Sequence, residues 1–243
     1  MSRSMIVTGM VLSAMPVGEF DRRVVMLTRE QGKIAAFARG ARRPRSQLLA
    51  ATGPMAFGTF EIYPGRNSYT LSGANIDAYF MDLARDYDKV CLSAYFLEVA
   101  EYYGLENDDE SQRLTLLYLT LRAMESGRFT HRLLRIIYEI RTMGINGEYP
   151  DVFSCAVCGG KEDLAYFHMG RRAVICRNCE PGEGGRLISG SALYALQYIL
   201  TAPMKKLFSF RLTEAVEEEV WGILRDYRGR YLDHAFKSEA FLQ

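Results

Sequence analysis

Residues 24–38 have the sequence VVMLTREQGKIAAFA. Val24–Thr28 is a short run of β-branched and apolar residues, and Lys33–Ala38 is a second apolar run. Gln31 and Gly32 lie between the two runs, where a glycine allows the chain to turn back on itself. The stretch therefore predicts two adjacent strands.

This pair of strands belongs to a β-rich region that extends from residue 4 to about residue 73. Phe57–Tyr63 alternates side chains as a strand does, Pro64–Asn67 is a turn, and Ser68–Ser72 returns. Short strands with Gly and Pro between them predict a small barrel or sandwich. Their order is consistent with a five-stranded barrel of the oligonucleotide-binding (OB) type, although spacing alone leaves other small barrels open.

From Asn75 onward the apolar residues recur at helical spacing. The expected helices are Tyr79–Tyr103, one that Asn107–Asp109 caps and Ser126-Gly127 ends, one over about Phe129–Met143, one from Ala192 to Leu200 capped by Ser189, and a last one capped by Thr213. The predicted fold class is α+β. It comprises an N-terminal five-stranded OB-fold barrel (1–75), a helical domain (76–150 and 188–243) and a four-cysteine zinc module (151–187) inserted in the helical domain.

Four cysteines lie in the inserted segment. Cys155-Ala156-Val157-Cys158 is separated by 17 residues from Cys176-Arg177-Asn178-Cys179. Two residues between thiolates allow a tight turn to direct both sulfurs at one ion, and a second pair completes a tetrahedron. We therefore expect one structural Zn²⁺ on Cys155, Cys158, Cys176 and Cys179. Two reactive or disulfide-bonded pairs are the alternative, and we expect His168 to be no ligand and Cys91 to be a core residue.

Positive charge is concentrated near the N-terminus. Residues 22–45 hold eight Lys or Arg side chains against one acid, so this segment carries +7 although the whole chain carries +1. This asymmetry is expected of a phosphate-binding surface. Aromatic residues nearby, of which Tyr63 and Tyr69 are the best candidates for exposure, could stack on bases. The alternative is a solvated charge run that protects a sheet edge from aggregation.

The sequence argues against several classes of protein. No apolar run approaches the roughly 20 residues that span a bilayer, and the first residues do not resemble a signal peptide, so we expect a cytoplasmic protein without a membrane partner. Neither a phosphate-binding loop nor a nucleophile elbow nor a zinc-protease motif is present. We expect no enzyme. A metal-dependent nuclease stays an alternative, and Glu217–Glu219 is interpreted as a charge run on a helix surface.

The stretch Gly32–Ser46 resembles the N-terminal signature of RecO recombination-mediator proteins. Tyr138–Gly144, then Pro150 and the four cysteines, resembles the helix that leads into the zinc module of that family. The resemblance covers the whole chain in length and domain order. It implies an OB barrel, a helical domain with inserted zinc, and no hydrolytic chemistry.

The resemblance also implies function and partners in DNA repair and recombination. RecO proteins bind single- and double-stranded DNA, anneal complementary strands, engage the acidic tail of single-stranded DNA-binding protein (SSB), and act with RecR, and in many settings RecF, to load RecA. The implied phosphate contacts are Lys33, Arg39, Arg42 and Arg43, followed by Arg22, Arg23 and Arg45. The implied contacts with the SSB tail are Arg128, Arg132 and Arg135, beside the apolar Leu133, Leu134 and Ile136, although a solvated helix face is an equal alternative. An RNA-binding protein and a zinc-containing interaction adaptor are the other functions left open.

Overall fold

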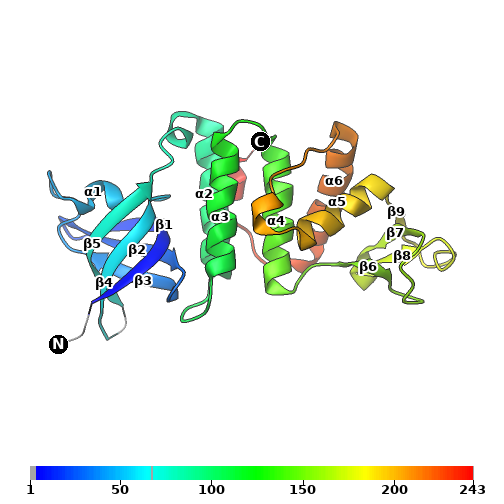
Figure 1. Ribbon diagram of the computed structural model, residues 1–243, viewed down its shortest axis with the longest axis horizontal. Helices are drawn as coiled ribbons and strands as arrows, with labels where there is room; N and C mark the ends of the chain where they lie inside the picture. The colour runs from blue at the N-terminus through cyan, green and yellow to red at the C-terminus, as the bar shows by residue number, and fades with distance from the viewer. Residues whose placement is uncertain (1–3, 67, 243) are drawn as a thin grey trace. The chain divides into compact units, whose positions relative to one another are not determined.

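A computed structural model describes residues 4–66 and 68–242 (Figure 1). Contacts divide the chain into two compact units, Met1–Ser126 with Ala235–Gln243, and Gly127–His234. Among the described residues, no helix has the length and apolar character that crossing a membrane requires. The division into 1–75, 76–150 with 188–243, and 151–187 stays a prediction.

The first unit contains the barrel and two long helices. Its elements are β1 (Met5–Val17), β2 (Asp21–Thr28), β3 (Gly32–Ala38), α1 (Leu48–Ala51), β4 (Phe57–Pro64), β5 (Tyr69–Ala78), the 3₁₀ turn η1 (Leu83–Arg85), α2 (Tyr87–Tyr103), α3 (Ser111–Glu125) and the 3₁₀ turn η4 (Lys237–Phe241). The strands close in the order β1-β2-β3-β5-β4. Among the described barrel strands, β3 and β5 pair in parallel and the other neighbours pair antiparallel. The predicted OB-type barrel is confirmed.

Alternation along the strands fills the barrel. Val24 and Met26 of β2, Ile34 and Ala36 of β3, and Phe60 of β4 all point into one buried cluster. Every second residue of each strand faces outward. The outer face therefore carries the side chains that a ligand can reach, except where α2 and α3 contact the strands and outward residues such as Val25 and Leu27 are buried.

The boundary between strands and helices differs from the prediction. β5 continues to Ala78, past Asn75, and the helix begins at Tyr87 rather than Tyr79. Asp86 fixes the start because its carboxylate accepts hydrogen bonds from the amides of Asp88 and Lys89, at 3.1 and 3.2 Å. Phe80 and Leu83 have the expected apolar spacing and are buried. However, Phe80 has a φ of 52°, which is outside the right-handed helical region.

One of the other three predicted caps is absent. Ser189 caps its helix as expected, since its hydroxyl accepts from the amide of Ala192 at 3.1 Å. In the predicted segment Asn107–Asp109, the Asp109 carboxylate accepts from the amide of Ser111, the first residue of α3, at 3.0 Å. Thr213 precedes its helix without a side-chain cap.

The second unit packs three helices beside a small sheet. Its elements are α4 (His131–Asn146), β6 (Asp151–Cys155), β7 (Leu164–His168), the 3₁₀ turn η2 (Met169–Arg171), β8 (Ala173–Cys176), β9 (Arg186–Leu187), α5 (Gly190–Thr201), the 3₁₀ turn η3 (Met204–Lys206) and α6 (Glu214–Tyr231). The sheet has the order β6-β8-β7-β9. α4, α5 and α6 contact one another and bury Ile137, Ile199 and Ile223.

The interpretation of Glu217–Glu219 as a surface charge run is confirmed for Glu218, whose side chain is 60% exposed, and is wrong for Glu217. Glu217 is buried and accepts a hydrogen bond from the Thr130 hydroxyl, which caps α4. Glu219 accepts from both the amide and the hydroxyl of Ser189, which caps α5. The first two turns of α6 therefore stabilise the starts of two other helices.

Candidate functional site

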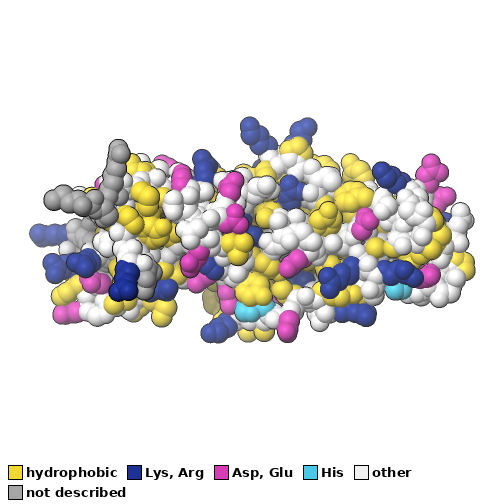
Figure 2. All heavy atoms as spheres, turned by 90° about the horizontal axis from the view of Figure 1, so that it is seen from below, with side chains coloured by type: hydrophobic (Ala, Val, Ile, Leu, Met, Phe, Trp, Pro, Cys, Tyr) yellow, Lys and Arg dark blue, Asp and Glu magenta, His cyan; other side chains and the backbone are white. Residues whose placement is uncertain are grey.

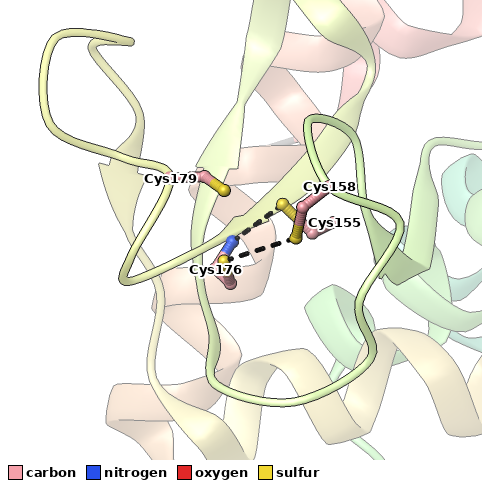
Figure 3. A group of neighbouring side chains, drawn as sticks. All are labelled: Cys155, Cys158, Cys176 and Cys179. Carbon is pink, nitrogen blue, oxygen red and sulfur yellow. Dashed lines mark hydrogen bonds between the residues drawn. The ribbon is translucent and has the colours of Figure 1, made fainter.

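The four predicted cysteines converge at one point of the second unit (Figure 3). Their sulfur atoms all lie within 4.8 Å of one another, and the Sγ atoms of Cys158 and Cys176 are 3.9 Å apart. A tetrahedron of thiolates at the usual Zn–S length has sulfur–sulfur edges of about 3.8 Å. The four cysteines therefore form a metal-binding cluster, which we call the four-cysteine cluster.

Each pair of cysteines lies on a turn that follows a strand. Cys155 ends β6, and Gly159, at a φ of 73°, returns its amide to the Cys155 carbonyl at 2.8 Å. Cys176 ends β8 and accepts at its carbonyl from the amide of Cys179 at 3.1 Å. A Cβ at Gly160 would lie 3.3 Å from the Cys158 sulfur, so a residue without a side chain leaves that sulfur its space.

The cluster has the electrostatics of a cation site. Burial raises the pKa of the Cys155 thiol, but backbone amides of Cys158, Cys176 and Val157 stabilise its thiolate and lower the pKa to about 6. Interactions with the sulfurs of Cys176 and Cys158 raise the pKa of Cys179 to about 12. One thiolate therefore forms readily, and the ionisation of a neighbour is resisted unless a cation neutralises the charge.

The cluster lies in a small core of its own, while Val152, Phe167 and Val174 of the same module are buried outside that core. Cys155, Ile175 and Cys176 are its buried members, with Leu164 and Tyr166 packed against them. A core this small does not stabilise a fold by itself, so a bound metal would supply much of the stabilisation. His168 lies outside the cluster, since its Nε2 meets the Glu183 carbonyl at 2.8 Å and its Nδ1 accepts from Arg171 N.

The predicted phosphate contacts fall into two groups. Arg39, Arg42, Arg43 and Arg45 are exposed on the loop between β3 and α1, which we call the arginine loop (residues 39–45). Arg42 N donates to the Phe20 carbonyl at 2.8 Å, and the Arg43 guanidinium lies 5.1 Å from the centre of the Phe20 ring. These contacts fix the loop beside the turn between β1 and β2.

The remaining three cations lie on the strands. Arg22 donates to the Leu49 carbonyl and the Thr52 hydroxyl, both at 2.8 Å, and so ties α1 to the barrel. Lys33 donates to the Glu101 carbonyl at 2.7 Å, near the end of α2. Arg23 is partly exposed on the outer face of β2. Arg22 and Lys33 therefore have structural partners, which the sequence pattern did not indicate.

The arginine loop keeps its charge uncompensated. Within residues 4–66 and 68–242, no carboxylate forms an ion pair with any of its four arginines. Asp21, on the adjacent strand, accepts from the amide of Gly40 at 2.7 Å. Figure 2 shows Lys and Arg side chains gathered over the barrel. This surface can attract a polyanion.

The arginines expected to bind a protein tail have different surroundings. Arg132 forms an ion pair with Glu218. Arg135 meets Glu139 at 3.0 Å, and its guanidinium lies 4.7 Å from the Trp221 ring centre. Arg128 is exposed. The adjacent Leu133, Leu134 and Ile136 are buried, so the expectation that they offer an apolar surface is wrong.

Comparisons with known proteins match nearly the whole length of this chain. A family model described as Recombination protein O N terminal matches residues 1–80, and one described as Recombination protein O C terminal matches residues 84–240. A DNA repair protein RecO of Acetivibrio thermocellus is 30% identical over 97% of this chain and 95% of its own length. One of Caldanaerobacter subterraneus subsp. tengcongensis is 30% identical over 95% and 94%, and one of Bacillus pumilus is 27% identical over 96% and 91%. With its OB-type barrel and its four-cysteine cluster, the chain belongs to the recombination protein O (RecO) family of DNA repair and recombination proteins.

Proposed function

We propose that this chain is a non-enzymatic recombination mediator. It binds single- and double-stranded DNA, anneals complementary strands and, with RecR, helps to load RecA on single-stranded DNA coated by SSB. RecF also takes part in RecA loading where it is required. The protein acts in the cytoplasm. The observation that carries the proposal is the arginine loop, four exposed arginines without acidic partners on an OB-type barrel.

Annealing by this surface requires no covalent chemistry. Two complementary strands repel each other through their phosphates, and guanidinium groups that neutralise both strands lower that repulsion. Each neutralised phosphate also releases counterions, which favours binding at low salt. Arg39, Arg42, Arg43 and Arg45 supply the contacts, and Arg23 adds a fifth cation on the adjacent strand. Arg22 and Lys33 contribute charge, but their hydrogen-bonding groups already have protein partners.

The ion that the four-cysteine cluster holds is proposed to be one Zn²⁺. Cys155, Cys158, Cys176 and Cys179 would fill its coordination shell, so the metal stabilises the fold and leaves no position for a substrate. The backbone amides of Cys158, Cys176 and Val157 surround the buried Cys155 sulfur and favour its thiolate, which is the form that binds zinc.

The second unit is the proposed receptor for the SSB tail. Tyr194, Phe210 and Val216 line a cavity of about 520 Å³ whose rim includes Arg211. Val216 lies two residues before Glu218, the partner of Arg132. An acidic tail with an apolar end suits this combination of cations and apolar surface. We place the tail here, with Arg128, Arg132 and Arg135 as surrounding cations, and RecR on the barrel.

A salt titration tests the DNA-binding proposal. The triple variant Arg39→Ala, Arg42→Ala, Arg43→Ala is compared with wild type for binding to labelled single-stranded DNA, with and without SSB. If each arginine meets one phosphate, the slope of log affinity against log salt decreases in magnitude by about 2 to 3. A matched control, Lys205→Ala, Arg225→Ala, Arg230→Ala, removes the same charge from exposed positions of the second unit.

Different outcomes support the rival functions. A wild-type slope near zero, or a triple variant that binds as wild type does, contradicts the proposed surface. Tighter binding to RNA than to DNA of equal length supports an RNA-binding protein, because only recognition of the 2′-hydroxyl prefers RNA. No DNA binding at low salt supports a protein adaptor, and cleavage of labelled DNA in magnesium supports a nuclease.

A further inference from the structure

The four cysteines of the four-cysteine cluster differ in their exposure to solvent. Cys158 is exposed, Cys179 is partly exposed, and Cys155 and Cys176 are buried. Val157, next to Cys158 on the first turn, is 47% exposed, so this part of the turn faces solvent. A small oxidant dissolved in water therefore reaches Cys158 before it reaches the buried cysteines.

The exposed cysteine has a second sulfur within reach on the other turn. The Sγ atom of Cys176 lies 3.9 Å from that of Cys158 (Figure 3). Cys155, the other buried member, accepts a hydrogen bond at its sulfur from the amide of Cys176 at 3.4 Å. A disulfide joins sulfurs about 2.05 Å apart, so an approach of about 2 Å is enough to connect the two turns.

Strand pairing links the second turn to the segment that precedes α5. Cys176 ends β8, which pairs with β7. In turn β7 pairs with β9, where Tyr166 is the direct partner of Leu187. The amide of Ile188 donates to the Ala165 carbonyl at 2.8 Å. The order of the cysteine module therefore determines where the chain enters α5.

The start of α5 forms a wall of the cavity in the second unit. Ser189 caps the helix, and Tyr194 lines the cavity of about 520 Å³ opposite Phe210 and Val216. Glu219 holds Ser189 as well, by accepting from its amide and its hydroxyl. Loss of the β7–β9 pairing should therefore loosen this wall rather than unfold the whole helix.

We propose that the four-cysteine cluster is a redox switch for this cavity. A peroxide oxidises Cys158, Cys176 forms a disulfide with it, the metal is lost, and the wall at the start of α5 loosens. This inference rests on the proposed function, because both the bound Zn²⁺ and the protein tail in the cavity belong to that proposal.

The oxidation proceeds in two balanced steps. The Cys158 thiolate attacks one oxygen of hydrogen peroxide, the O–O bond breaks and hydroxide leaves, so the sulfur becomes a sulfenic acid. The Cys176 thiolate then attacks that sulfur, the S–O bond breaks and a second hydroxide leaves. The two sulfurs lose two electrons and the peroxide gains them. Two thiolates remain, too few for a four-thiolate metal site, and the small core of the module opens.

Treatment of the reduced, zinc-loaded protein with hydrogen peroxide tests the switch. Released zinc is measured, disulfides are mapped by mass spectrometry, and amide hydrogen exchange is compared between residues 186–195 and Gly32–Ala38 of the barrel. We expect loss of the zinc, a Cys158–Cys176 bond, and faster exchange over 186–195 alone. A thiol reductant with added zinc should reverse all three changes. Cys91→Ser is the matched control and should respond as wild type does.

Three results overturn the switch. The first is zinc that stays bound while peroxide is consumed. The second is a disulfide between Cys155 and Cys158, which would leave the two turns unconnected. The third is unchanged exchange over residues 186–195 after complete oxidation, because the cluster would then have no effect on the wall of the cavity.

Ser189→Ala separates the wall from the metal. This variant should keep its zinc, while exchange in the first turn of α5 should be about fivefold faster, as expected for loss of an N-cap. The probe for the cavity is a labelled peptide of four aspartates that ends in phenylalanine. Oxidation of the wild type should weaken its binding by at least the same factor, and unchanged affinity would overturn control of the cavity.

The peptide also keeps the inference distinct from the proposed function. Reduced, zinc-loaded protein that does not bind the peptide contradicts the proposed tail site. In that case disulfide mapping and hydrogen exchange still decide whether oxidation of the cluster loosens α5.

Discussion

Arg22 and Arg39 belong to one basic segment but have different surroundings. Arg22 donates two hydrogen bonds, to Leu49 O and to the hydroxyl of the fully buried Thr52. Arg39 is exposed and has no ion-pair or hydrogen-bond partner among the residues that the structure describes. Two arginines that look alike in the sequence therefore differ in the structure: Arg22 stabilises the fold and Arg39 lies on the surface.

This difference gives opposite phenotypes for two single variants. Arg22→Ala removes the hydrogen bonds that hold α1 and should lower the free energy of unfolding by about 1.5–3 kcal/mol. Arg39→Ala should change it by less than about 0.5 kcal/mol while weakening DNA binding. Urea unfolding and a DNA titration of both variants measure the two effects. Equal loss of stability in both would contradict the assignment.

The cysteines differ in the same way. Cys158 is exposed at the four-cysteine cluster, whereas Cys91 is buried on α2 in the other unit. Cys158→Ser should abolish stoichiometric zinc because a hydroxyl is a poor substitute for a thiolate ligand. Cys91→Ser is the matched control and should retain the metal. Metal analysis of the purified proteins measures this, and zinc retained by Cys158→Ser would argue against a four-thiolate site.

At the scale of elements, two glycines at the ends of barrel strands adopt left-handed backbone angles. Gly32 starts β3 at a φ of 65°, and a Cβ there would lie 2.3 Å from the Leu105 carbonyl oxygen. The adjacent Lys33 amide donates to that same carbonyl at 2.8 Å. Gly18, between β1 and β2, has a φ of 55° but nothing within 4 Å of its Cβ position.

Alanine substitutions at these two glycines distinguish the cost of backbone strain from the cost of steric overlap. Gly18→Ala should cost about 1–2 kcal/mol, the usual penalty of a left-handed residue with a side chain. Gly32→Ala should cost clearly more, because the segment at Leu105 must also move. Thermal and urea unfolding of the two variants test the comparison. Equal destabilisation would mean that the Leu105 segment yields easily.

The structure also changes how the helix starts are explained. Apolar spacing predicted that a helix begins at Tyr79, but Asp86 supplies a cap and α2 begins at Tyr87. Periodicity finds buried side chains such as Phe80 and Leu83, and these positions are buried without being α-helical. Hydrogen-bonding groups, and not apolar spacing, determine the end of an element.

At the scale of the molecule, the four-cysteine cluster and the arginine loop lie in different compact units. The four-cysteine cluster lies within Gly127–His234, and the arginine loop belongs to the unit with the barrel. The barrel has its own buried core, which includes Val24, Ile34 and Phe60. The proposed metal site and the proposed DNA-binding surface therefore depend on separate sets of contacts.

Removal of the metal should act locally. A chelator should increase amide hydrogen exchange over residues 151–176 and leave exchange in Gly32–Ala38 unchanged, because only the cysteine module relies on the metal for its core. Affinity for single-stranded DNA should be retained. Exchange followed by mass spectrometry measures the first effect. Increased exchange throughout the barrel would show that the metal stabilises more than its module.

Lower pH should have the same local effect. Protons compete with zinc for thiolates, so zinc affinity falls as pH falls. Exchange over residues 155–176 should therefore increase in acid before exchange in the barrel does. Repeating the measurement with saturating zinc should delay the change, and the absence of any delay would assign the acid sensitivity to other groups.

The sequence by itself determined the local chemistry. Alternation predicted the barrel strands, the spacing of Cys155, Cys158, Cys176 and Cys179 predicted their convergence, and Ser189 predicted a cap. These features are short in range: they follow from how a few neighbouring residues turn, alternate or coordinate. They required no knowledge of distant segments.

Only the tertiary structure decided which side chains are available. Arg22 and Lys33 find partners 30 and 68 residues away, and Glu217 holds the start of α4 from a position 87 residues later. Strand register brings Arg23, Phe37 and Tyr63 onto the same face of the barrel. Burial and pairing depend on contacts between distant segments, and local sequence patterns contain no information about which distant group will satisfy a charge or leave a ring exposed.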